Sequence, residues 1–289
     1  MILITGATGN VGRHTVTSLA EAGIPVRALV RDPARADFPA GVEVVTGDLT
    51  DPPSLAPALD GVEEVFLIWP GFAASTAAQV VDLIARHARR IVYLSANLRP
   101  GSTMFHVEVE RLIRGAGPAW TFLRPGGFAT NTLGWAREIL DTGTVRWVYG
   151  QAARSLIHEA DIAAVAAHVL TSAGHNHQVY VLSGPEALTQ VEQVRILGEV
   201  LGRPARWEEI APDAVVERLT AAWGDAELAK SSLETWESFI HTPEEVTDTV
   251  ERLIGRRART YRQWAIDRFG GFGGFGGFGG FGGLGGLGG

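Results

Sequence analysis

Three glycines spaced three residues apart follow the first apolar residues of the chain, in the run Gly6-Ala-Thr-Gly9-Asn-Val-Gly12. The residues before them, 2–5, predict a buried strand, and a helix-compatible run begins near Asn10. A strand, a glycine turn and a helix together suit a dinucleotide pyrophosphate. Gly6 allows the tight turn, Gly9 lets backbone approach the phosphates, and Gly12 lets the helix pack closely. We therefore predict a dinucleotide site rather than a turn that binds nothing.

Two charged residues after the next apolar segment decide between the nicotinamide cofactors. Asp32 lies 20 residues after Gly12, where an acid would hold the ribose hydroxyls of NAD. Arg31 comes first, and a guanidinium there suits the 2′-phosphate of NADP. Arg13 offers a second positive charge or is a solvated helix residue, and Asp48 fits either the adenine amino group or a turn cap. We expect NADP(H) rather than NAD(H).

A histidine and a glutamate are the candidates for proton transfer or charge stabilisation. His106 and Glu110 lie four residues apart in a predicted helix over 103–115, so they share one helix face. His106, with an unperturbed pKa of about 6.5, suits a proton donor. The simpler interpretation is a His106–Glu110 pair that serves packing. The chain has no cysteine, which excludes thiolate catalysis and disulfides.

Alternating strands and helices must position these side chains. We predict strands at 2–5, 26–30, 42–46, 65–69, 91–95 and 119–123, with helices between them. This pattern predicts an α/β fold with a doubly wound parallel sheet of the Rossmann type, whose ligands lie at the carboxyl ends of the strands. The Rossmann core is expected at 1–125, completed by 155–182 with a strand at 179–182. The expected cofactor contacts are Gly6, Thr8, Gly9, Asn10, Val11, Gly12, Arg31, Asp48, Leu49, Ile68, Trp69, Pro70, Ser95, Pro125 and Gly126.

The segments 126–154 and 183–268 predict a smaller, mostly helical C-terminal substrate lobe rather than a second independent core. Helices are expected near 130–140, 188–201, 212–222, 225–238 and 242–254, and another at 159–172 with Glu159 and Asp161 as capping residues. The expected substrate contacts, each with core packing as the alternative, are Trp69, Phe72, Phe128, Asn131 and Trp135. Residues 269–289 repeat Phe-Gly-Gly five times and Leu-Gly-Gly twice, which predicts a flexible tail or a segment that binds a partner.

The overall composition limits the classes of binding partner and the cellular location that we expect. A net charge of −7 without a basic cluster argues against nucleic acid. No run reaches about 18 apolar residues, so we expect no membrane span and a cytoplasmic protein. No histidine is accompanied in the sequence by other residues of the types that bind metals, so we expect no metal site. A small-molecule substrate is the expected partner, with a homo-oligomer among the options for assembly.

These motifs together resemble the NmrA-like, atypical branch of the short-chain dehydrogenase/reductase superfamily over residues 1–268. The resemblance rests on Gly6-Ala-Thr-Gly-Asn-Val-Gly12, Leu29-Val-Arg-Asp-Pro33, Gly47-Asp-Leu49, Thr121-Phe-Leu-Arg-Pro-Gly126 with Phe128 and Asn131, Glu159-Ala-Asp-Ile162 and Arg259-Thr-Tyr-Arg-Gln-Trp264. It implies that Ser95 matches the active-site serine and that His106 and Glu110 face the nicotinamide ribose and substrate. The family includes NADPH-dependent quinone reductases, other reductases, and regulatory proteins that bind dinucleotide without turnover.

One departure from the superfamily pattern argues against the usual catalytic mechanism of the superfamily. The helix after the fifth strand lacks the usual Tyr and Lys, and the single lysine of the chain, Lys230, lies elsewhere. The leading hypothesis is an NADPH-dependent oxidoreductase that acts on a small planar quinone-like, carbonyl or imine substrate, for which the cofactor supplies the reactivity. The alternative is a non-catalytic NADP(H) sensor, and a third option is cofactor-retaining isomerase chemistry.

Overall fold

A seven-stranded parallel sheet forms the centre of the computed structural model, which describes residues 1–71, 73–98, 102 and 104–270. The strand order is β3-β2-β1-β4-β5-β6-β9, so the order reverses between β1 and β4. This confirms the predicted doubly wound sheet and its last strand. The strands are β1 (Ile2–Ile4), β2 (Val26–Val30), β3 (Glu43–Thr46), β4 (Glu64–Ile68), β5 (Arg90–Leu94), β6 (Ala119–Pro125) and β9 (Gln178–Leu182).

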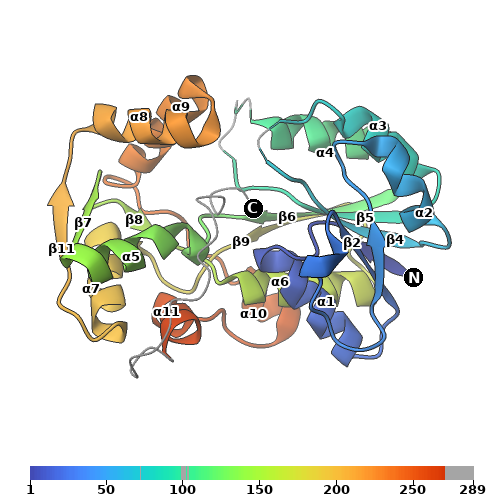
Figure 1. Cartoon of the computed structure of the whole chain (residues 1–289), viewed down its shortest axis with the longest axis horizontal. Helices are drawn as coiled ribbons and strands as arrows, with labels where there is room; N and C mark the ends of the chain where they lie inside the picture. The colour runs from blue at the N-terminus through green and yellow to red at the C-terminus, as the bar shows by residue number, and fades with distance from the viewer. Residues whose placement is uncertain (72, 99–101, 103, 271–289) are drawn as a thin grey trace.

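Helices cover both faces of this sheet (Figure 1). On one face lie α1 (Asn10–Glu21), α6 (Glu159–Thr171) and α10 (Thr249–Ile254), and on the other lie α2 (Ala56–Leu59), α3 (Ala77–Ala85) and α4 (Phe105–Gly115). Neighbouring strand residues alternate between the two layers, since Ile4 and Phe66 pack with α1 and α6 while Leu3 and Leu67 pack with α2 and α3. Strands buried on both faces explain the nearly continuous apolar runs in the sequence.

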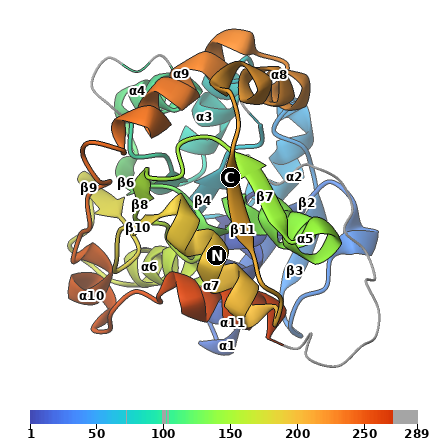
Figure 2. The same ribbon diagram turned by 90° about the vertical axis from the view of Figure 1, so that its left-hand side faces the viewer.

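The C-terminal part contributes a second lobe next to the carboxyl end of β6. Its elements are η3 (Ala129–Thr132), α5 (Leu133–Thr142), β7 (Thr144–Trp147), β8 (Ala153–Arg154), β10 (Leu188–Thr189), α7 (Gln190–Val200), β11 (Arg206–Glu209), α8 (Pro212–Trp223), α9 (Ala226–Ser238) and α11 (Tyr261–Phe269). β7 pairs with β11 in parallel and β8 pairs with β10 in antiparallel (Figure 2). Two short turns, η1 (Pro33–Arg35) and η2 (Pro52–Leu55), connect strands of the main sheet.

The lobe differs from the sequence prediction in three respects. It has apolar clusters of its own, one around the buried Trp264 and another around Val215 and Leu219. The paired strands β8, β10 and β11 were not predicted, because segments of two to four residues carry too little periodicity. The helix expected at 242–254 begins only at Thr249, because the backbone before it pairs with the lobe, with Glu244 N donating to Ala153 O over 3.0 Å.

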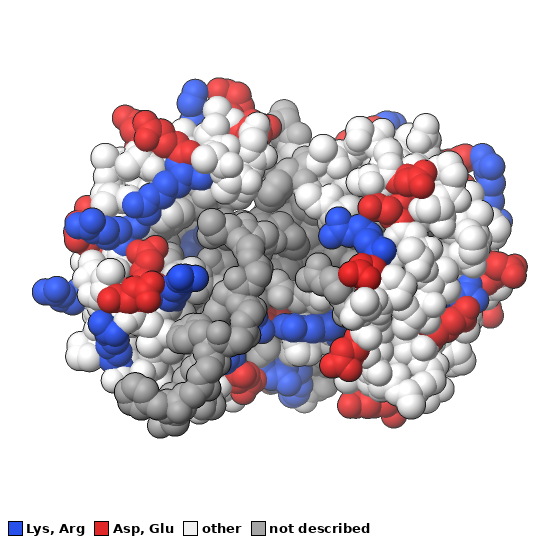
Figure 3. All heavy atoms as spheres, in the orientation of Figure 1, with Lys and Arg blue, Asp and Glu red and all other residues white. Residues whose placement is uncertain are grey.

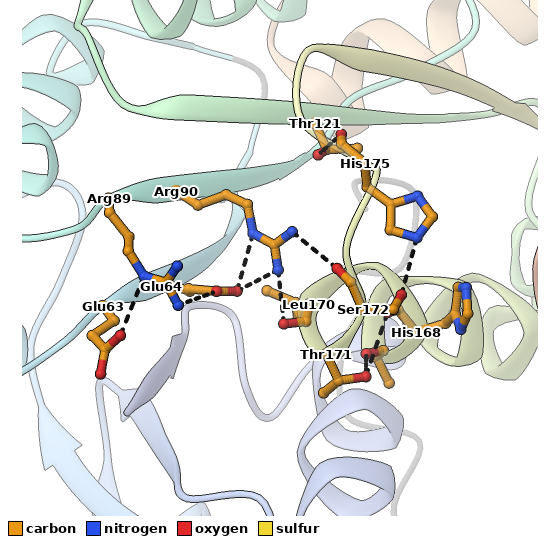
Figure 4. A network of polar contacts seen from close by, with 11 residues as sticks. Glu63, Glu64, Arg89, Arg90, Thr121, His168, Leu170, Thr171, Ser172 and His175 are labelled. Atoms are coloured by element: carbon orange, nitrogen blue, oxygen red, sulfur yellow. Dashed lines mark hydrogen bonds and ion pairs between the residues drawn. The ribbon is translucent and has the colours of Figure 1, made fainter.

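A polar network closes the amino ends of the strands, opposite the predicted site (Figure 4). The buried Arg90 guanidinium donates to Glu64 Oε2 at 2.6 Å and to Leu170 O at 2.7 Å, which ties β4 and β5 to the end of α6. His175 lies 3.0 Å from Ser172 Oγ in the same network. On the face shown in Figure 3, basic and acidic side chains are interspersed.

Candidate active site

The glycine turn lies where β1 ends beside β4, at the reversal of the strand order. Gly6 has φ +56°, a conformation that favours glycine, and a Cβ there would lie 3.0 Å from Ile68 Cγ2. A Cβ on Gly12 would lie 2.2 Å from Gly6 O, so only glycine lets α1 approach the turn this closely. Thr5 Oγ1 joins the two strand ends by donating to Ile68 O over 2.9 Å and accepting from Ile68 N over 2.7 Å.

The N-terminus of α1 fits a phosphate group. Gly9 is the N-cap and offers no side-chain cap, and the first turn holds no acidic residue. The first helical hydrogen bond runs from Arg13 N to Gly9 O at 3.2 Å. Within the described part of the chain, the amides of Asn10, Val11 and Gly12 therefore have no acceptor and are left for a ligand, at the positive end of the helix dipole.

The ends of β2 and β3 present the groups expected near the adenosine. Arg31 is exposed, and its side chain makes no hydrogen bond or ion pair with any residue that the structure describes. Asp32 accepts from Ala34 N at 3.0 Å, so it caps η1. Asp48 accepts from Thr50 N at 2.8 Å, which is the turn-cap alternative, and the neighbouring Leu49 O accepts from Thr76.

Glu110 on α4 is the centre of a charged cluster beside the end of β5. Its buried carboxylate accepts from Ser95 Oγ at 2.7 Å, Arg124 Nε at 2.8 Å and Arg114 Nη2 at 2.9 Å. Burial alone would raise the pKa of Glu110, but the hydrogen bonds from Arg124 and Ser95 and the guanidinium charges lower it below its usual value. Ser95 donates its hydroxyl hydrogen to this carboxylate, so the lone pairs of its oxygen are left to accept from a ligand.

His106 does not pair with Glu110, which contradicts the packing alternative considered from the sequence. Its Nδ1 lies 2.6 Å from the hydroxyl oxygen of Tyr93 on β5. Burial lowers the pKa of His106 to about 4, although the Glu110 charge acts in the opposite sense. The imidazole is therefore neutral at pH 7 and does not act as a cationic acid. Tyr93 was missed because nothing in the sequence links it to His106.

The turn after β6 is held by a residue from the far end of the chain. Glu244 accepts from Gly127 N at 3.3 Å and Ser155 N at 3.1 Å, and it pairs with Arg154 at 2.9 Å. A Cβ on Gly126 would lie 2.7 Å from Glu244 Oε1, so this glycine makes room for the carboxylate. Pro125 is buried, and its carbonyl accepts from Asn97 N at 2.8 Å. No sequence signal indicated the role of Glu244.

The aromatic residues expected to contact substrate lie mostly within the fold. Trp69 is buried, and its indole N–H donates to Ala73 O at 2.7 Å. Phe128 and Trp135 are buried in two different apolar clusters. Asn131, like Thr8 and Pro70 of the cofactor set, is exposed, and Phe72 lies outside the described residues, as does the tail beyond Gly270.

The start of α6 corrects one further expectation. The N-cap is His158, whose Nδ1 accepts from Ala160 N at 3.0 Å, and not Glu159 or Asp161. Asp161 instead binds Arg256 at 2.7 Å and also Arg259. Among residues 1–71, 73–98, 102 and 104–270, no group of three or more metal-type ligands comes together. In the same described part of the chain, no helix combines the length and apolar character of a membrane span.

The chain is similar to known reductases over almost its whole length. It is 40% identical over 288 residues to the (4-alkanoyl-5-oxo-2,5-dihydrofuran-3-yl)methyl phosphate reductase of Streptomyces griseus, which covers 92% of this chain and 97% of that protein. It is 33% identical over 278 residues to the NAD(P)H azoreductase of Xenophilus azovorans, covering 92% and 96%.

Solved structures and family models agree with these relatives. The NADPH-dependent quinone oxidoreductase 2 of Escherichia coli superposes with a TM-score of 0.78 at 27% identity, covering 93% of this chain and 100% of that chain. That enzyme has also been solved in complex with NADPH. A family model described as NAD(P)H-binding matches residues 6–173, which include the glycine turn, Ser95 and Glu110. The chain therefore belongs to the NAD(P)H-binding family and is related to reductases of the atypical short-chain dehydrogenase/reductase type.

Proposed function

We propose that this protein is an NADPH-dependent oxidoreductase that transfers hydride to a small, planar, conjugated acceptor, either quinone-like, carbonyl or imine. The observation that carries the proposal is the glycine turn at the reversal of the strand order, with the free amides of Asn10, Val11 and Gly12 at its end. Two residues expected at the nicotinamide lie nearby, Ser95 directly after β5 and His106 on α4.

The names of the relatives support a conjugated acceptor. They describe the reduction of an unsaturated furanone phosphate, of azo compounds and of quinones. Each of these acceptors delocalises the negative charge that hydride addition creates. Its reduction therefore needs less help from an acidic side chain of the protein than the reduction of an isolated ketone does. This low requirement for an acid suits a site in which α4 carries a neutral histidine in place of the Tyr–Lys pair.

Each residue near the expected nicotinamide has a role in this proposal. Bound NADPH supplies the hydride, and water supplies the proton that completes the reduction. The amides of the turn bind the diphosphate, and Arg31 binds the 2′-phosphate. Ser95 accepts a hydrogen bond from the cofactor, with its orientation fixed by Glu110. His106 donates a hydrogen bond to the acceptor as negative charge develops there.

The preference for NADPH over NADH is part of the same proposal. It is supported by the Arg31 side chain, which is exposed at the end of β2 and has no partner among the described residues, and by the NADPH complex of the related Escherichia coli enzyme. Asp32, the residue that would favour NAD, is engaged with Ala34 N in η1. The Arg31 guanidinium is therefore the exposed charge at the end of β2 that suits a 2′-phosphate.

The test is the loss of the NADPH absorbance band during incubation with a benzoquinone, an alkylidene or alkanoyl butenolide, and an azo dye. Turnover of at least one acceptor class, faster with NADPH than with NADH, supports the proposal. Tight calorimetric binding of both NADP⁺ and NADPH without turnover of any acceptor would support the redox-sensor alternative. Binding of neither cofactor would overturn both.

A further inference from the structure

The hydroxyl group of Tyr93 has a single hydrogen-bond partner in the described part of the chain, His106 Nδ1 at 2.6 Å. The Tyr93 side chain is completely buried, and its ring packs edge-on against Phe122. A buried O–H without an acceptor costs about 1–3 kcal/mol. The phenolic hydrogen is therefore directed at Nδ1, because the described residues offer it no other acceptor.

This direction of the hydrogen bond fixes the tautomer of the imidazole. A neutral ring that accepts on Nδ1 carries its hydrogen on Nε2. Nε2 of His106 has no partner among the residues that the structure describes. His106 as a whole residue is only partly buried, which is compatible with a ligand reaching this N–H.

Two hydrogen bonds place this group relative to Ser95. Tyr93 on β5 and Ser95, the residue that follows the end of this strand, both contact α4, where His106 and Glu110 lie four residues apart on one helix face. Tyr93 binds His106 and Ser95 binds Glu110 at 2.7 Å, so strand and helix are held in register by two adjacent polar contacts. The imidazole of His106 and the hydroxyl of Ser95 are thus each held at the contact between α4 and the end of β5.

We propose that Tyr93 is a positioning residue for hydride transfer. It donates to His106 Nδ1 and so keeps the hydrogen of the neutral imidazole on Nε2, where it is offered to the acceptor. This inference rests on the proposed function and assigns a role to a residue outside the expected site. With NADPH bound as the hydride donor, Nε2–H would donate a hydrogen bond to the acceptor as negative charge develops on it, and water would provide the proton.

The proton of Tyr93 stays in place during this step. Burial, and secondly the charge of Glu110, raise the pKa of the Tyr93 phenol well above its ordinary value, so a phenolate is not formed. The titratable groups that face His106 are Tyr93 from β5 and Glu110 from its own helix. Tyr93 thus acts through orientation and not as an acid.

The experiment combines ring ¹⁵N spectra with kinetics for Tyr93→Phe. In the wild-type protein at pH 7 we expect the His106 shifts of a ring protonated on Nε2 alone, and in Tyr93→Phe a mixture of both tautomers. Turnover of the best acceptor should fall about tenfold, the equivalent of one hydrogen bond of about 1.4 kcal/mol, while the KM for NADPH stays unchanged.

Tyr180→Phe is the matched control. Tyr180 on β9 makes the same kind of bond, with its hydroxyl 2.8 Å from His175 Nδ1, outside the proposed site. This variant should keep its turnover and the His106 spectrum.

A wild-type His106 protonated on Nδ1, or full turnover in Tyr93→Phe, overturns the inference. Full turnover in His106→Ala would instead remove His106 from the proposed function. If no acceptor is reduced at all, the proposed reaction fails, while the spectra still test the tautomer.

Discussion

A side-chain carbon on Gly12 would lie 2.2 Å from the carbonyl oxygen of Gly6. The same carbon would lie 2.9 Å from the Cα of Ala7, so backbone surrounds the position on two sides. The start of α1 must therefore move away from the turn if any other residue replaces Gly12. The amides proposed to hold the diphosphate move with it.

Gly12→Ala should consequently weaken NADPH binding at least tenfold by calorimetry, because the turn and the helix N-terminus no longer converge on one phosphate. Gly134→Ala is the control, since a Cβ there meets nothing within 4 Å and alanine is favoured over glycine in α5. It should bind NADPH like the wild type. Equal affinities in both variants would refute the assigned role of the turn.

Arg31→Ala should raise the Kd for NADPH about tenfold to a hundredfold and that for NADH less than about twofold. The reason is the loss of one charged hydrogen-bonding partner of the 2′-phosphate, a group that NADH lacks. Fluorescence titration with both cofactors measures the ratio. Arg86→Ala removes another exposed arginine, one that pairs with Asp82, and should leave both constants unchanged. Equal weakening of NADPH and NADH by Arg31→Ala would contradict the assignment.

Glu110→Gln should lower the free energy of unfolding at pH 7 by about 3 kcal/mol, because it leaves Arg114 and Arg124 without their buried counter-charge. The folded pKa of Glu110 lies below its usual value of 4.5, so its stabilising effect is complete above that pH and is lost as pH falls through the folded value. Urea unfolding at pH 7 and near pH 3 tests this expectation.

The stability gap between wild type and Glu110→Gln must shrink at the lower pH. A gap of the same size at both pH values would exclude the ion-pair explanation. Glu108→Gln, on the same helix, removes a carboxylate that pairs with Arg111 at the surface and should change stability little.

The pH profile of turnover should lack a limb from His106 near its ordinary pKa of about 6.5. Because the pKa of His106 in the fold is about 4, initial rates should not change with its titration until the pH approaches that value. Below it, the imidazolium can no longer accept from Tyr93, and the rate falls. A limb near pH 6.5 that disappears in His106→Asn would show that the folded pKa is not lowered.

The lowered pKa of His106 also predicts how the free energy of unfolding depends on pH. The unfolded chain binds a proton at His106 before the folded chain does, so the wild type loses stability as pH falls from about 6.5 toward the folded pKa. His106→Asn removes this contribution, and its stability should fall less over the same interval in urea unfolding.

Local features of the sequence determined the main sheet and the cofactor turn. The mostly apolar segments at 2–4, 26–30 and 64–68 form strands because both of their faces are covered by helices, so each segment carries its own signal. The glycines at 6, 9 and 12 act within a single βα unit, and their spacing alone indicated the geometry that is observed.

The tertiary structure alone decided which side chains meet around β5 and α4. Glu110 binds Ser95 and Arg124, His106 binds Tyr93, and Glu244 reaches the turn after β6. Helical spacing placed His106 and Glu110 on one face but could not choose their partners, which come from other strands and from a segment over a hundred residues away. A sequence pattern records periodicity within one element, whereas partner choice and pKa depend on how separate elements pack, which only the folded chain specifies.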